Sequence, residues 1–168
     1  MTTLHKLKGR YKEGHYGVVF FELQDFAIKV FKKNSGTTRE HVEAVFKSEV
    51  DAYLLATANE KLKHYIPEFF GVFLCNKVLN SSGHDISESY HLDLSYKMKR
   101  IDGNFVKGFD DTCIDGLFST VGIRYTNDAS VLYEDGRVKC VIDFAVEEHE
   151  LFHSDIGTSS SDSIFDLK

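Results

Sequence analysis

The chain has little of several features that mark particular classes of protein. It has one proline in 168 residues and no long Gly/Ser tract, so no interdomain linker is visible. No apolar run is long enough for a transmembrane helix, and the first residues, MTTLHKLKGRYKEG, have no apolar core. We therefore expect neither a membrane span nor a secretory signal peptide. No internal repeat is visible either.

Cysteine and positive charge are also scarce. The three cysteines, Cys75, Cys113 and Cys140, are odd in number and widely spaced, which argues against a disulfide framework and against a zinc site. A reducing, cytoplasmic location is the simpler interpretation. The net charge of −6 argues against general nucleic-acid binding, which requires clustered Lys and Arg. The 42% of hydrophobic residues suffice for one domain with a sizeable core or for two small lobes that share a cleft.

Two β-prone runs, 12–21 and 25–31, predict an antiparallel pair of strands with a glycine turn at its open end. The turn contains Gly14 and Gly17. A backbone without Cβ can lie flat over a polyphosphate and offer its N–H groups, although a plain hairpin turn would also explain these glycines. The second run places Lys29 among apolar residues, where an ammonium group must be paired or must reach water.

A helix is predicted over residues 38–59, with Thr38 as its N-cap. Glu49 lies within its apolar face and therefore requires a cation, for which Lys29 is the candidate. Glu40 and Glu43 fall toward the polar face. The apolar residues that recur at the three- and four-residue spacing of a buried face are Val42, Val45, Phe46, Val50, Tyr53 and Leu54.

A hairpin is predicted late in the chain, where the short β-prone runs 131–133 and 138–142 flank an Asp-Gly turn at residues 135–136. Asp143 follows the second run at the point where the apolar stretch stops. By its position alone it is either a turn residue or a metal ligand. The remaining segments are a polar loop at 80–89, a half-buried strand at 90–98 and a short helix at 111–121.

These segments, in this order, resemble the fold of protein kinases and of their aminoglycoside-kinase relatives. Residues 13–19 (EGHYGVV) and 27–29 (AIK) resemble the glycine-rich loop and the phosphate-binding lysine strand, with Lys12 in the place of the first glycine. Residues 130–132 (SVL) and 142–144 (IDF) resemble the hairpin that carries the metal-binding aspartate of that family.

The resemblance implies a site for ATP and Mg²⁺. In this family a glutamate on the long helix holds the strand lysine toward the α- and β-phosphates, which gives these roles to Glu49 and Lys29. Residues 99–103 resemble the hinge between lobes, and Met98 before it would lie behind the adenine or belong to the ordinary core. The residues implied to contact ATP are Gly14, Gly17, Val19, Ala27, Lys29, Met98, Lys99 and Ile101, and those implied to hold the metal are Asp143 and Ser130.

The segment that corresponds to the catalytic loop, residues 122–130, departs most from the family. It is about two residues short, with Tyr125 in the place of the histidine and Ser130 in that of the asparagine. Strict register puts Asn127 where the catalytic acid belongs, and an amide cannot act as a base. A shortened loop could present Asp128 instead, whereas Asp128 as a helix or turn cap is the alternative.

The implied fold is α+β: a minimal bilobal kinase-like fold with an antiparallel sheet and one long helix in an N-lobe, residues 1–102. The C-lobe, residues 103–168, is strongly reduced and ends in a polar tail, GTSSSDSIFDLK, which we expect to be loosely held. Such truncation is typical of the minimal effector kinases that Gram-negative pathogens inject into host cells. The resemblance thus implies a virulence effector, delivered by a specialised secretion system.

Three classes of function follow from these observations. The first is a Ser/Thr protein kinase that acts on a host protein, with a chaperone or the ubiquitin machinery as the implied partner. The second is a pseudokinase, a nucleotide-binding or inert scaffold that engages a partner without phosphoryl transfer. The third is an immunity or antitoxin-like binding protein that matches the family by chance. The sequence leaves the substrate and the oligomeric state open.

Overall fold

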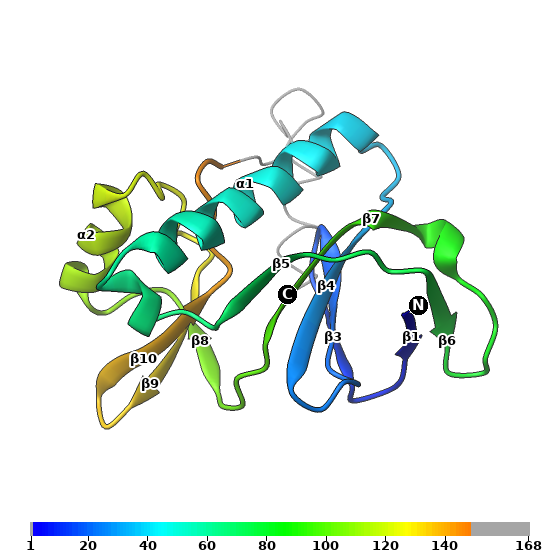
Figure 1. Ribbon diagram of the computed structural model, residues 1–168, viewed down its shortest axis with the longest axis horizontal. Helices are drawn as coiled ribbons and strands as arrows, with labels where there is room; N and C mark the ends of the chain where they lie inside the picture. The colour runs from blue at the N-terminus through cyan, green and yellow to red at the C-terminus, as the bar shows by residue number, and fades with distance from the viewer. Residues whose placement is uncertain (1, 149–168) are drawn as a thin grey trace. The chain divides into compact units, whose positions relative to one another are not determined.

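The computed structural model describes residues 2–148, so the polar tail expected at the end of the chain lies outside the described residues (Figure 1). The described part is α+β, with two α-helices and mostly antiparallel sheets, as predicted. It forms two compact units, residues 2–44 with 72–97 and residues 45–71 with 98–148. Within this part, no helix combines the length and the apolar character needed to cross a membrane.

The first unit is built mainly of strands. Strand β3 pairs antiparallel with β4, as predicted for the runs 12–21 and 25–31, and Val19 lies opposite Lys29. The glycine turn divides the first run into β2 and β3, which pair antiparallel with each other, and the sequence did not predict this division. Strands β1 and β6 form a parallel pair that the sequence did not predict. In the larger sheet the strands of this unit have the order β2-β3-β4-β7. The bounds are β1 (Thr3–Lys6), β2 (Tyr11–Glu13), β3 (Gly17–Phe20), β4 (Phe26–Lys32), β6 (Lys77–Asn80), the 3₁₀ turn η2 (Ser87–Ser89) and β7 (Tyr90–Lys99), whose last two residues belong to the second unit.

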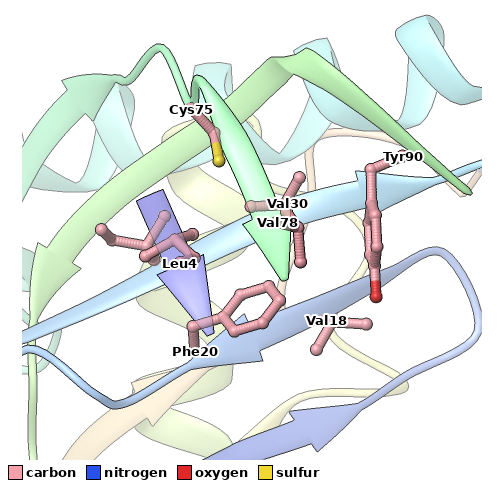
Figure 2. Packing of buried hydrophobic residues seen from close by; sticks show 8 residues of the cluster. Leu4, Val18, Phe20, Val30, Cys75, Val78 and Tyr90 are labelled. Carbon is pink, nitrogen blue, oxygen red and sulfur yellow. The ribbon is translucent and has the colours of Figure 1, made fainter. Parts of the chain in front are cut away.

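The core of the first unit lies on one face of its sheet. Because side chains alternate along a strand, Val18 and Phe20 of β3 share a face with Ile28 and Val30 of β4. Figure 2 shows the side chains of β3, β4, β1 and β6 pointing toward one another in this cluster. Lys29 is therefore on the opposite face of the sheet. The members of the cluster are Leu4, Val18, Phe20, Ile28, Val30, Cys75, Val78 and Tyr90.

The second unit combines most of one long helix with a short helix and a three-stranded sheet of order β10-β9-β8. Figure 1 shows β9 and β10 as a hairpin with β8 alongside β9. The short helix α2 agrees with the prediction, and its N-cap Asp111 accepts hydrogen bonds from the backbone of Cys113 and Ile114. The bounds are α1 (Arg39–Ala58), η1 (Leu62–His64), β5 (Phe69–Val72), β8 (Phe105–Lys107), α2 (Thr112–Thr120), β9 (Ser130–Glu134) and β10 (Arg137–Ile142).

Helix α1 confirms the predicted span and N-cap, because the Thr38 hydroxyl accepts a hydrogen bond from the His41 backbone at 3.1 Å. Its predicted buried face is right except at Leu54, whose exposed fraction is 52%. Toward the end of the helix the buried positions are Ala52 and Ala56, together with the predicted Tyr53. These small side chains, four residues apart, turn the buried face away from Leu54.

The predicted late hairpin is confirmed. Strand β9 pairs antiparallel with β10, and Asp135 and Gly136 form the turn with φ of 53° and 74°. Directly after β10, Phe144 is buried among other aromatic rings. Its ring centroid lies 4.5 Å from that of Tyr53 and 4.9 Å from that of Phe118. This cluster anchors the chain at the exit of the hairpin.

Candidate functional site

The glycine turn of the first unit makes a close approach to Lys29. The Gly14 N–H donates to the Gly17 carbonyl at 2.8 Å, which closes the turn. A Cβ on Gly17 would lie 2.9 Å from the Val30 carbonyl oxygen and 3.2 Å from Cε of Lys29. The lysine side chain therefore runs over the Gly17 backbone, and only glycine leaves room for it.

Lys29 is half-buried on the face of the sheet away from the apolar cluster. Its Nζ lies 4.9 Å from the ring centroid of Phe31 and 6.0 Å from that of Tyr96, distances at which a cation and an aromatic face attract each other. Val19 lies opposite Lys29, and Ala27 is buried in the same strand. This face thus presents one cation beside apolar and aromatic groups, a surface suited to a phosphate next to a planar ring.

Three hydrogen bonds that were not predicted from the sequence hold the tip of the glycine turn. The Tyr16 hydroxyl lies 3.0 Å from Nε2 of His41, at the start of α1. The Tyr16 carbonyl accepts from the Lys32 backbone at 2.9 Å. Asn34 donates to the carbonyl of His15 at 2.8 Å. The turn is therefore fixed in position before any ligand binds.

Asp143, in the second unit, has a left-handed backbone with φ of 62°. Such a conformation is uncommon for a residue with a side chain and is often found at functional sites. The side chain is half-exposed, and its Oδ2 accepts a hydrogen bond from the Ser130 hydroxyl at 3.2 Å. The structure thus brings together the two residues predicted to hold the metal.

Lys107 belongs to the same cluster and was missed from the sequence. It lies opposite Ser130 in the β8–β9 ladder. Its Nζ donates to the carbonyl of Asp128 at 2.8 Å and lies 4.0 Å from Oδ2 of Asp143. No local sequence pattern identifies this lysine. Strand β8 has only three residues, too few to show a periodic pattern, and its partner β9 lies more than twenty residues farther along the chain.

The altered loop is held beside Asp143 by backbone pairing. Tyr125 and Ala145 form a β-bridge, with N–H to carbonyl distances of 3.1 and 3.0 Å. The Tyr125 hydroxyl donates to Oδ2 of Asp128 at 2.6 Å. Asn127, which strict register put in the place of the catalytic acid, is exposed. Asp128 is thus the residue that the loop fixes, through its carboxylate and through its carbonyl.

Glu49 is buried, as predicted for an acid on the inner face of α1, and Glu40 and Glu43 are exposed, also as predicted. One turn farther along, Tyr53 is fully buried, which raises the pKa of its hydroxyl well above the ordinary value. The nearby carboxylates of Asp143 and Glu49 raise this pKa further. Since Lys29 belongs to the first unit, its pairing with Glu49 stays a prediction.

Ser48 ties α1 to the segment that follows Asp143, a link that the sequence did not show. Its hydroxyl donates to the carbonyl of Glu147 at 3.1 Å and accepts from the Glu147 N–H at 3.0 Å. The Ser48 carbonyl also accepts from the Val146 N–H at 3.2 Å. These contacts fix the helix turn that carries Glu49 against residues 145–147.

The segment predicted to be a hinge begins at the end of β7. Met98 is buried there, and the Lys99 N–H donates to the carbonyl of Glu68 at 2.8 Å. Ile101 is half-buried. A Cβ on Gly103 would lie 2.6 Å from Cδ1 of Leu132, so this segment passes directly over the middle of β9.

Within residues 2–148, no group of three or more His, Cys, Asp or Glu side chains gathers as a metal site. Asp143 and Ser130 offer one carboxylate and one hydroxyl, both oxygen ligands. Mg²⁺ is commonly bound by one or two carboxylates, with phosphates and water as the other ligands. The residues therefore fit a Mg²⁺ ion that arrives with a nucleotide better than a metal held by protein alone.

Comparison with protein-family models, with curated proteins and with solved structures finds no significant match to this chain.

Proposed function

We propose that this protein has a minimal bilobal kinase-like fold and transfers the γ-phosphoryl group of ATP to Ser or Thr hydroxyls of a protein. The observation that supports this proposal best is the geometry of Asp143. Its carboxylate stands at the exit of a buried hairpin, in a left-handed backbone, with the Ser130 hydroxyl on one oxygen. The neighbouring Phe144 is buried, so the position of the carboxylate is set by the core.

The roles of the other residues follow from their chemistry. Lys29 supplies a cation for the α- and β-phosphates, beside the turn of Gly14 and Gly17. Glu49 is proposed to hold the Lys29 ammonium in place, as an acid that needs a cation at a buried position. Purine contacts fall to Val19, Ala27 and Met98 and to the backbone of Lys99 and Ile101.

Asp143 and Ser130 would hold Mg²⁺, which neutralises charge on the phosphates when it is bound. In the transfer step, the oxygen of the substrate hydroxyl forms a bond to the γ-phosphorus. The bond from that phosphorus to the β,γ-bridging oxygen breaks, and its electron pair leaves with ADP. Asp128 orients the hydroxyl and accepts its proton.

The proposed substrate class rests on the resemblance to minimal effector kinases. On that basis the partner is a host protein such as a chaperone or a component of the ubiquitin machinery, and the protein acts in the host cytoplasm after secretion. Phosphoryl transfer depends mainly on position and charge, so a shortened catalytic loop lowers its rate without abolishing it.

A pseudokinase is the second candidate, and one contact favours it. The Tyr125 hydroxyl donates to the Asp128 carboxylate at 2.6 Å, and a carboxylate that accepts a short hydrogen bond is a weaker base. In that case the site binds MgATP and presents a surface to a partner, but no phosphoryl group is transferred.

Thermal unfolding with MgATP tests nucleotide binding, because a ligand that binds only the folded state raises the midpoint. We expect a rise for the wild type and none for Asp143→Asn. Asp135→Asn is the matched control, since Asp135 shares the left-handed backbone and lies at the other end of β10. Absence of a rise in the wild type at millimolar nucleotide would refute the proposed site.

Transfer of labelled phosphate from ATP then separates the two candidates. We expect the wild type to label itself or a generic protein substrate, and Asp128→Asn to bind MgATP normally while labelling is lost. A wild type that binds MgATP and labels nothing is a pseudokinase. Labelling that persists in Asp143→Ala would overturn the assignment of the metal site.

A further inference from the structure

We propose that Lys107 contacts the phosphoryl group that is transferred and serves as a built-in cation in place of a second metal ion. This inference rests on the proposed kinase function. It starts from a residue that the family resemblance did not include and that the structure places within the cluster of Ser130 and Asp143.

Three contacts locate the Lys107 side chain. The residue lies directly opposite Ser130 in the ladder between β8 and β9. Its Nζ donates to the Asp128 carbonyl at 2.8 Å and lies 4.0 Å from Oδ2 of Asp143. The ammonium group therefore stands between the backbone carbonyl of the proposed catalytic residue and the carboxylate of the proposed metal ligand, near the path that a phosphoryl group would take between nucleotide and substrate.

The charge of the bound nucleotide suggests a role for the Lys107 ammonium group. In protein kinases a second Mg²⁺ is held by an asparagine of the catalytic loop. Here that place is taken by Ser130, a neutral hydroxyl that already donates to Asp143. One divalent ion and Lys29 leave negative charge on a triphosphate, and a further cation at Lys107 would balance it.

The Lys107 side chain is also free enough to change its contact. Its exposed fraction is 51%, and a lysine carries its charge on a flexible four-carbon stem. Mg²⁺ and the ammonium group compete for the Asp143 carboxylate, since both are cations near the same oxygen. With a metal held by Asp143, the Lys107 ammonium group would be free to turn toward a phosphate.

The test compares the affinities of MgATP and MgADP by calorimetry in the wild type and in Lys107→Gln. The variant would lose a hydrogen bond from the Lys107 ammonium group to the γ-phosphate, which ATP has and ADP lacks. We therefore expect MgATP to bind about tenfold more weakly to the variant. The affinity for MgADP should be unchanged. Lys107→Arg should retain most of the preference for ATP, since its charge is kept.

Lys139→Gln is the control, because Lys139 is a half-exposed lysine of the same sheet whose Nζ lies 3.2 Å from Glu134. It should leave both affinities as in the wild type. Equal weakening of MgATP and MgADP in Lys107→Gln would show that Lys107 only supports the fold of the loop, and would overturn the inference.

Failure of the two proposals can be told apart. A wild type that binds neither nucleotide refutes the kinase proposal, and the inference falls with it. A wild type that binds both, together with a Lys107→Gln variant that binds both equally well, refutes the role of Lys107 alone and leaves the kinase proposal standing.

Discussion

Asp135 and Asp143 lie at opposite ends of strand β10, and they are the two non-glycine residues in the described part of the chain with a positive φ, 53° and 62°. At Asp135 the hairpin turn requires this conformation. At Asp143 no tight hairpin turn requires it, and the residue is held by its neighbours. The strain there is therefore a property of the site.

This strain predicts a separation of stability from binding. We expect Asp143→Gly to be more stable than Asp143→Ala by about 1 kcal/mol, because alanine pays for the left-handed backbone and glycine does not. Neither variant should bind Mg²⁺ with ATP. Urea unfolding measures the first effect and thermal shift with MgATP the second. Equal stabilities of the two variants would contradict the assigned backbone conformation.

The glycine turn predicts unequal effects at its two glycines. Gly17→Ala places a Cβ 2.9 Å from the Val30 carbonyl and should lower the free energy of unfolding by about 1–3 kcal/mol. Gly14→Ala is the control, since its Cβ would be 3.5 Å from the nearest atom, an ordinary contact. Urea unfolding of both variants decides the matter, and a loss at Gly14 as large as that at Gly17 would speak against the described turn.

The link between Ser48 and Glu147 predicts a cost in stability. Ser48→Ala removes two hydrogen bonds at a buried position and should lower the free energy of unfolding by about 1–3 kcal/mol. Ser119→Ala is the control, because the Ser119 hydroxyl is exposed and bonds only one turn back in its own helix. Chemical denaturation should show a loss for the first variant and almost none for the second.

Burial of cysteine predicts both reactivity and pH dependence. Burial raises the pKa of the Cys140 thiol to about 12 and raises that of Cys75 as well, whereas Cys113 is exposed. Only the thiolate reacts with an alkylating reagent, so at pH 8.5 iodoacetamide should modify Cys113 first. Mass spectrometry after short exposure measures the order. Modification of Cys140 before Cys113 in the folded protein would contradict the described burial.

The same raised pKa predicts loss of stability in alkaline solution. In the unfolded chain the thiol releases its proton near its ordinary pKa, while in the folded protein Cys140 keeps it up to about pH 12. The folded state binds more protons in this window, so stability falls as pH rises from about 9 toward 12. Cys140→Ala should show a shallower fall in urea unfolding over the same range.

Local patterns in the sequence predicted the elements well. The periodicity of α1, its Thr38 cap, the Asp-Gly turn of the late hairpin and the short helix α2 are all set by residues close together in the chain. The burial of Glu49 also followed from its place in that periodicity. The predicted burial of Leu54 was wrong. Toward the end of the helix the buried positions are occupied by alanines, and the spacing of large apolar residues does not reveal them.

Contacts between distant segments could not be predicted. The parallel pair of β1 and β6, the bond from Ser48 to Glu147 and the place of Lys107 opposite Ser130 all join residues far apart in the chain. Each of these contacts depends on the topology of the whole chain, which a single sequence does not reveal. For the candidate site, the sequence predicted Asp143 and Ser130 but not the cation beside them.

Because Lys107 must lie opposite Ser130 in the β8–β9 ladder, the number of residues from Gly103 to Lys107 is constrained. Since β8 has only three residues, one residue inserted before Phe105 would bring Val106 to the place of the lysine and turn the ammonium group to the other face of the sheet. Descendants of this sequence should therefore keep the number of residues in that stretch constant, with glycine at position 103, where a Cβ would meet Leu132, and lysine at position 107.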